Sequence, residues 1–316
     1  MKININNTNK LLLSSALCTT LVACGGSTEQ IIEDALNGLS LNSSNYQSFV
    51  QTGVGGSATI VSQLLFATNE IDTSELIVSS YTDNSYTYNC HNQGGTFVKT
   101  TIDDDTLKMD FSNCHITDYE PDSKYDGSMT ISTVVNSGSL SEVGDSDYDW
   151  DITQTINLDN FVQTSPIDGG DSNTYNGDTT IDTSNDSADN LNVITMSSTN
   201  LLVDSIDASS SSVTSYSFSD LFIERKEDTS DESSVADLDF TAEISDIGDI
   251  QVTTDTALVT DSSGLLQSGD LVTTTGNSSI KMIAIGNDNV ELSLDYDNDG
   301  SYDGSVSTTW ASIYGE

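Results

Sequence analysis

The chain has 316 residues, of which 50 are Asp or Glu and 8 are Lys or Arg, and its formal net charge at pH 7 is -42. A charge this negative repels nucleic acid and anionic lipid head groups and attracts cations, so nucleic acid is excluded as a partner. Hydrophobic residues make up only 35% of the chain, which raises the question of disorder. Its tyrosines, phenylalanines and regularly spaced Ile, Val and Leu predict a folded protein instead.

The N-terminus has the pattern of an export signal. Lys2 and Lys10 give it a positive start, and residues 11–22 are apolar but too few to span a bilayer. Small residues and Cys24 end the apolar run. A segment of this kind is removed on export. An ordinary buried cysteine in a core helix is the alternative interpretation of Cys24.

The sequence Leu21-Val22-Ala23-Cys24 resembles the lipobox of bacterial lipoproteins, in which the cysteine is acylated and the peptide is cut just before it. The resemblance implies that residues 1–23 are a signal peptide and that Cys24 anchors the mature protein in a membrane. Several acyl chains together hold a protein there stably. Gly25 and Gly26 lack the aspartate that retains some lipoproteins in the inner membrane. The resemblance therefore favours the outer membrane, with the protein facing the periplasm or the cell surface.

Helical spacing of apolar residues occurs only before residue 70. Residues 24–44 are expected to form a lipidated tether. A single domain is expected over residues 45–316, because no linker rich in Pro, Gly or Ser interrupts them. It begins with one or two amphipathic helices between residues 46 and 68. Their apolar faces carry Tyr46, Phe49, Val50 and Val54, and Ile60, Val61, Leu64 and Leu65.

From Leu76 onward the apolar residues alternate with polar ones, which predicts β-strands with one wet face. Clear examples are residues 107–111, 150–158, 238–244 and 290–296. Clusters of Asp, Asn, Ser and Gly between them are typical of tight turns, so successive strands are expected to pair antiparallel. A sheet this large must hide its apolar face. We therefore predict an all-β fold, a large curved antiparallel meander (a half-barrel or open barrel) with the N-terminal helices packed against its apolar face.

A short sequence pattern recurs within the β-rich region. Residues 125–131 (YDGSMTI) resemble residues 175–181 (YNGDTTI), and Tyr302-Asp303-Gly304 repeats the opening. We predict that each occurrence is a turn that launches a strand.

Two cysteines remain in the mature part of the chain, Cys90 and Cys114. In an exported protein they meet an oxidising compartment, which predicts a disulfide between them. His91 and His115, the only histidines, each follow one of these cysteines. A reduced Cys/His site for zinc or copper is therefore the alternative interpretation.

Residues 295–303 (DYDNDGSYD) resemble the calcium loops of EF-hand, dockerin and thrombospondin type 3 modules. The resemblance implies that calcium is the cofactor and that its ligands include Asp295, Asp297, Asp299 and Asp303. Position 12, usually a bidentate Glu, is Val306, so the implied site is weak. A solvated hairpin turn without an ion is the alternative.

No catalytic residue is predicted. The chain contains no G-x-S-x-G, P-loop, H-E-x-x-H or G-x-G-x-x-G motif, and its two histidines beside an expected disulfide are poor candidates for a general base. Carboxylate pairs are too numerous for any one pair to stand out.

The lipobox followed by an acidic β-meander resembles the uncharacterised β-rich lipoproteins of Gram-negative bacteria, over residues 45–316. The resemblance implies a non-enzymatic, lipid-anchored binding or structural module of the envelope. Its partners would be the membrane, through the anchor, and an envelope protein or a hydrophobic ligand. The alternatives are a carrier that holds an acyl chain on the concave side of the sheet, an integral outer-membrane β-barrel, and an enzyme with a few partly buried carboxylates.

Overall fold

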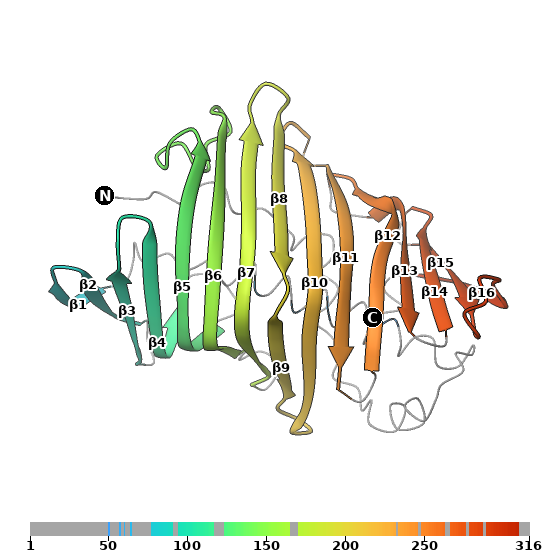
Figure 1. Cartoon of the computed structure of the whole chain (residues 1–316), viewed down its shortest axis with the longest axis horizontal. Coiled ribbons are helices and arrows are strands. Elements are labelled where there is room, and N and C mark those ends of the chain that lie inside the picture. The colour runs from blue at the N-terminus through green and yellow to red at the C-terminus, as the bar shows by residue number, and fades with distance from the viewer. Residues whose placement is uncertain are drawn as a thin grey trace.

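A computed structural model describes Val50, Ser57, Ile60, Leu64 and residues 77–90, 94–116, 123–164, 170–231, 233–245, 248–262, 266–275, 278–286 and 289–309. Its described part is dominated by one sheet of 16 strands, in which every pair of neighbours is antiparallel (Figure 1). The predicted all-β antiparallel meander is therefore confirmed.

The strands follow one another in the chain as β1 (Ile77–Thr82), β2 (Ser85–Asn89), β3 (Thr96–Thr101), β4 (Thr106–Ile116), β5 (Ser123–Ser137), β6 (Trp150–Thr164), β7 (Ser172–Asp186), β8 (Leu191–Ser198), β9 (Leu201–Asp207), β10 (Ser212–Asp228), β11 (Ser234–Ile244), β12 (Gly248–Thr260), β13 (Leu266–Thr275), β14 (Ser278–Ala284), β15 (Asn289–Asp295) and β16 (Gly304–Thr309).

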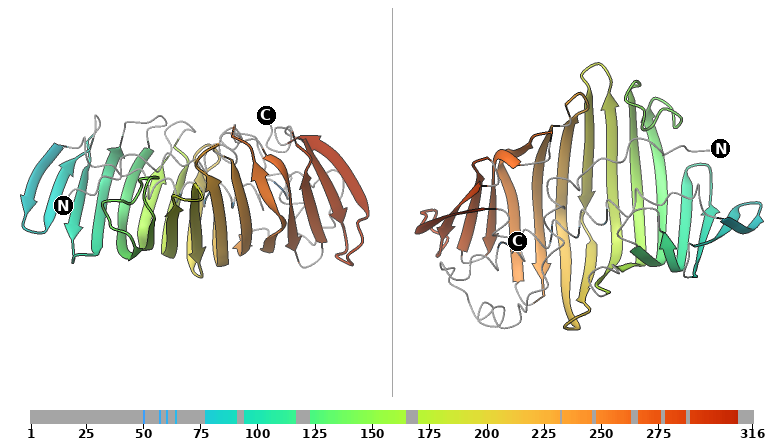
Figure 2. Two further views of the ribbon diagram at one scale, coloured as in Figure 1. Left: turned by 90° about the horizontal axis from the view of Figure 1, so that it is seen from above. Right: turned by 180° about the vertical axis from the view of Figure 1, so that it is seen from behind.

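The order of the strands in the sheet follows the sequence, with one position shared by two strands. β8 and β9 lie end to end between β7 and β10. β8 pairs with the C-terminal halves of β7 and β10, and β9 pairs with their N-terminal halves. β1 and β16 lie at opposite ends of a long row of strands (Figure 2). The described sheet is therefore open.

The two faces of the sheet differ in polarity, as the alternation in the sequence predicts. In β6, Trp150, Ile152, Ile156 and Leu158 are buried. Thr155, Asn157 and Asp159, which alternate with them, are exposed. We call the side that carries the buried residues the apolar face and the other side the polar face. Burial of one side of so many strands is the main stabilising term, at about 25 cal/mol per Å² of apolar surface removed from water.

The helices predicted over residues 46–68 lie outside the described residues, apart from four isolated positions. Val50, Ser57, Ile60 and Leu64 are all buried, and the three apolar ones belong to the same hydrophobic cluster as the apolar face. The signal peptide, the tether and Cys24 also lie outside the described residues. In the part of the chain that the structure describes, no helix has both the length and the apolar character needed to cross a bilayer.

A row of bulges crosses the middle of the sheet, in β4, β6, at the β8–β9 junction and in β10. Flanking each bulge are two buried residues that are three positions apart instead of two. The pairs are Phe111 and Cys114, Leu158 and Phe161, Ser198 and Leu201, and Phe218 and Leu221. An extra residue in a strand turns all later side chains to the opposite face. The bulges therefore return these residues to the apolar face.

Glycines in the neighbouring strands make room for two of the bulges. A Cβ atom on Gly127 would lie 1.9 Å from the carbonyl oxygen of Asn160, and one on Gly177 would lie 2.2 Å from that of Asn200. Asn160 itself has a φ of 47°, a left-handed conformation that asparagine tolerates better than most residues. Its N–H donates to Oδ1 of Asn176 at 2.9 Å. Each Asx-Gly pair thus supports the bulges on both of its sides.

This arrangement explains the recurring sequence pattern and corrects its interpretation. Residues 125–131 and 175–181 lie inside β5 and β7, so the prediction that they launch strands is wrong. Their glycines are needed because a neighbouring bulge approaches the backbone too closely for any side chain. The third occurrence does begin a strand, because Gly304 is the first residue of β16.

Replacing Gly127 by alanine should destabilise the protein more than the same change at Gly248. Both glycines have a positive φ, 87° and 91°, but only Gly127 faces a backbone atom within 4 Å. Gly248→Ala should therefore cost about 1 kcal/mol of backbone strain, and Gly127→Ala about 3 kcal/mol because the clash is added. Urea unfolding of the two variants measures the difference. Equal losses would mean that the close approach to Asn160 does not exist.

Candidate functional site

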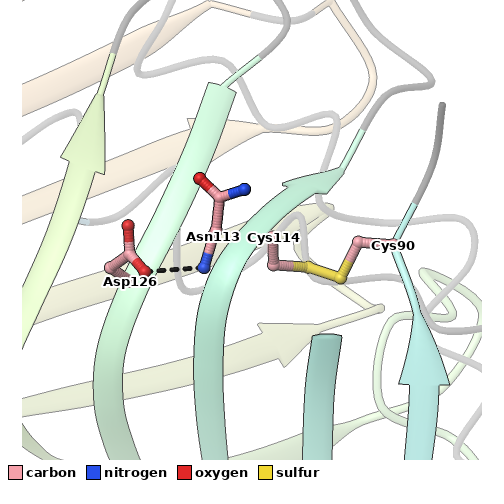
Figure 3. Close-up of a disulfide and its surroundings, with 4 residues drawn as sticks. All are labelled: Cys90, Asn113, Cys114 and Asp126. Carbon is pink, nitrogen blue, oxygen red and sulfur yellow. Dashed lines mark hydrogen bonds between the residues drawn. A yellow bond between two sulfur atoms is a disulfide. The ribbon is translucent and has the colours of Figure 1, made fainter. Parts of the chain in front are cut away.

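Cys90 and Cys114 form a disulfide in the structure, with their Cα atoms 5.3 Å apart. Cys90 directly follows β2 and Cys114 lies in β4, so the bond spans the start of β3 (Figure 3). The bulge before Cys114 turns its side chain to the apolar face, and the N–H of Asn113 in that bulge donates to Oδ1 of Asp126 at 2.6 Å. His91 lies outside the described residues. With both sulfurs in the disulfide, a Cys/His metal site would lack its thiolate ligands.

Loss of this disulfide should lower stability without changing the fold. Replacing both Cys90 and Cys114 by alanine should cost about 3 kcal/mol, the chain-entropy value for a loop of this length. Reduction of the wild type should produce the same loss in urea unfolding, and reductant should leave the double variant unaffected. An equal effect of reductant on both proteins would show that the disulfide does not form.

The aspartate-rich loop joins β15 to β16 and is held by its own side chains. Asp295, the last residue of β15, is 1% exposed, and its carboxylate accepts hydrogen bonds from the N–H groups of Asp299 (3.3 Å) and Gly300 (2.9 Å). Asn298 and Gly300 have positive φ values of 55° and 88°. A tight turn of this kind needs a glycine or an asparagine at such positions.

Three of the four aspartates predicted to bind calcium converge. One carboxylate oxygen each from Asp295, Asp297 and Asp303 lie within 4.8 Å of one another. Asp299 is outside this group, and its Oδ1 accepts from the N–H of Ser301 at 2.8 Å. Val306 packs against the hydrophobic core and offers no oxygen at position 12.

The loop therefore offers fewer ligands than a complete calcium site. Calcium takes six to eight oxygens, and here three carboxylates would need backbone carbonyls and water to complete the shell. Two of these carboxylates also serve the turn itself, since Asp303 accepts from the N–H of Tyr296 at 2.9 Å. The arrangement fits either a weak cation site or a hairpin turn stabilised by its own side chains.

Two shallow pockets flank the row of bulges on the polar face, each with a volume of about 390 Å³. Asp178, Asn200 and Asp220 line the first, together with the exposed ring of Phe222. The second lies on the other side of the β8–β9 junction and is lined by Asn176, Leu202, Asp204, Ser215, Tyr216, Ser217, Glu243 and Ser245. Sequence reasoning missed both pockets, because they depend on bulges that the simple alternation does not reveal.

The few cations of the polar face are tied to carboxylates. Nζ of Lys281 in β14 lies 3.0 Å from Asp255 of β12 and also pairs with Asp270 of β13. The hydrogen bonds that Lys281 donates to Asp270 and Asp255 raise its pKa. Burial raises the pKa of Asp270, but hydrogen bonds from Lys281 and Thr256 outweigh that effect and lower it. The remaining carboxylates keep this face strongly acidic, which favours cations over anions there.

An ion pair lies on the apolar face of the described sheet. Arg225 and Glu227 of β10 are each 8% exposed, and their charged groups are 3.4 Å apart. Burial lowers the pKa of Arg225, and the charge of Glu227 partly offsets this effect. The sequence does contain a sign of this pair, because Leu221, Ile223, Arg225 and Glu227 follow one another at intervals of two and therefore lie on the same face of β10.

No protein-family model, no curated protein and no solved structure matches the chain.

Proposed function

We propose that the chain is a lipid-anchored, non-enzymatic module of the outer membrane that binds an envelope component or supports envelope structure. The observation that carries the proposal is Cys24 directly after Leu21-Val22-Ala23, at the end of a short apolar segment with a positive start. The Cys90–Cys114 disulfide supports it, because such bonds persist outside the cytoplasm. The acidic polar face also fits a domain that is held at a membrane by its anchor alone.

The described surface supports a binding or structural role more than an enzymatic one. Both pockets on the polar face are lined by Ser, Thr, Asn, carboxylates and a few apolar side chains, with neither histidine nor cysteine among their lining residues. A general base near neutral pH usually needs a histidine or a carboxylate with a strongly raised pKa. Ser, Asn and Asp groups spread over open strands are better suited to hydrogen bonding a partner.

An acyl-chain carrier is the second candidate, and Arg225 is the observation that favours it. Arg225 pairs with Glu227 through Nη2, but its buried Nη1 has no hydrogen-bond partner among the described residues and could bind the carboxylate of an amphiphile. Both pockets, however, open on the polar face, which supports the binding or structural module. The integral barrel is supported less well, because a sheet within the bilayer must close to satisfy its edges and the described sheet is open.

Replacing Cys24 by serine should release the protein from the membrane. The variant should lose incorporation of labelled palmitate and move from the membrane fraction to the soluble fraction, because acylation supplies the anchor. Cys18→Ser is the matched control, since it removes another cysteine of the same segment and should leave both readouts unchanged. If Cys24→Ser retained label and membrane association, the anchored module would be refuted.

We also propose that the loop between β15 and β16 binds one calcium ion weakly, with Asp295, Asp297 and Asp303 as its carboxylate ligands. The affinity should resemble that of extracellular modules, with a dissociation constant on the order of 10⁻⁴–10⁻³ M. Terbium is a suitable probe, because Tyr296 and Tyr302 lie within the same loop and can sensitise its emission. The wild type should give saturable emission that calcium displaces.

A double variant at Asp297 and Asp303 tests the calcium site. Replacing both by asparagine should abolish the emission, because two of three converging carboxylates lose their charge. The control is Asp103→Asn with Asp105→Asn in the aspartate-rich turn between β3 and β4, which should leave the emission intact. Equal emission from both variants would mean that terbium binds the acidic surface non-specifically.

A further inference from the structure

The first hairpin of the sheet, β1 and β2, leaves one edge open. Among the described residues β1 pairs only with β2, on one side. Its residues from Val78 to Thr82 are all exposed, in contrast to the alternation of buried and exposed residues in the central strands. No described strand pairs with the backbone groups on its outer side, and such groups can pair with another strand.

This edge lacks the charges that normally protect an edge strand. Natural sheets discourage pairing with other chains by placing charged residues, especially lysine, on their edges. β1 has the sequence IVSSYT and carries no charge, although the chain contains 50 acidic residues. The edge is thus a place where two copies of this acidic chain can approach with little local repulsion.

The exposed apolar side chains of the hairpin continue a row of aromatic residues on the apolar face. Tyr81 stacks on Tyr86, with ring centroids 6.3 Å apart, and Tyr86 lies 6.5 Å from Tyr88. Tyr88 then stacks on the buried ring of Phe97 at 5.4 Å. Exposure rises outward along this row from 9% at Tyr88 to 42% at Tyr86 and 75% at Tyr81. The row therefore ends at the open edge with its outermost rings uncovered.

A bulge in β1 places Val78 on the same side as Tyr81. Val78 pairs with Tyr88 and Tyr81 pairs with Tyr86, and the register shifts at Ser79 between them. The hydroxyl of Ser79 donates to the carbonyl oxygen of Thr87 at 3.1 Å. Because the bulge interrupts β1 at Ser79, regular pairing of its outer edge with another strand is limited to the few residues around Ser80. Any interface formed by this edge is therefore short.

We propose that β1 pairs antiparallel with β1 of a second copy of this chain, so that the two sheets join edge to edge in a weak, symmetric dimer. A two-fold axis perpendicular to the sheet keeps both apolar faces on the same side. It also brings Val78 and Tyr81 of each copy against the same pair in the other copy. Contacts of this kind across antiparallel strands stabilise a sheet. The symmetry closes the assembly at two copies.

The strand directions favour this arrangement over head-to-tail pairing. Neighbouring strands alternate in direction, and β8 and β9 share one position, so β1 and β16 run parallel to each other at the two ends of the sheet. Pairing of β1 with β16 of another copy would therefore be parallel, which is slightly less stable per residue and leads to open chains of molecules. Self-pairing of β1 continues the antiparallel pattern of the whole sheet.

Sedimentation analysis of the full chain carrying Cys24→Ser tests the dimer independently of any lipid anchor. The wild-type edge should give a monomer–dimer equilibrium that strengthens with added salt, because salt screens the repulsion between two acidic molecules. Replacing Val78 and Tyr81 by lysine should weaken dimerisation at least tenfold. The control pair is Val134→Lys and Val213→Lys, which changes two valines of similar exposure (57% and 51%) away from this edge and should have no effect.

Cysteine cross-linking in the same background identifies the strands that meet. Ser80→Cys should give a covalent dimer on oxidation, since Ser80 lies near the proposed two-fold axis. A protein that carries both Ser80→Cys and Ser307→Cys should cross-link through residue 80 alone. A monomer at every concentration and salt level, a dimer that the lysine pair leaves unchanged, or cross-linking between residues 80 and 307 would each overturn the proposal.

Discussion

The row of bulges is the constraint on which the rest of the structure depends. The central strands, such as β5, β6 and β7, have 15 residues each, and every one must present its apolar side chains to the same face. One extra residue in each bulged strand moves Cys114 and Phe161 to the apolar face. The disulfide and the two pockets on the polar face follow from this change of direction.

The sequence predicted the class of fold well because alternation over many strands is a strong signal. β6 alternates on either side of its bulge and β11 alternates along its whole length, and turns rich in Asp, Asn, Ser and Gly predicted antiparallel neighbours. The bulges were not predicted, although a spacing of three before Phe161 and Leu221 contains the signal, with Asn160 and Asp220 in the extra positions. The repeated Asx-Gly pairs predict turns, because such pairs are common in turns, whereas a bulge depends on the neighbouring strand.

Some functional residues could likewise be predicted from local sequence, whereas others depend on contacts between distant parts of the chain. The disulfide was predicted from export and cysteine count, and the convergence of Asp295, Asp297 and Asp303 follows from spacing within a single loop. Arg225 and the pockets on the polar face depend on which strands lie side by side, which no local pattern specifies. The proposed role assigns one task to each part: Cys24 anchors, the apolar face stabilises, and the polar face and the first edge meet partners.

The exposure of two phenylalanine rings tests the central claim most directly. Counting by two from Leu158 and Phe218 would place Phe161 on the polar face and Phe222 on the apolar face, whereas the bulges reverse both positions. Relaxation of assigned ring protons by a soluble paramagnetic chelate measures this exposure. The account predicts strong broadening for Phe222 and protection for Phe161, which are 41% and 0% exposed. Protection of Phe222 together with broadening of Phe161 would contradict it.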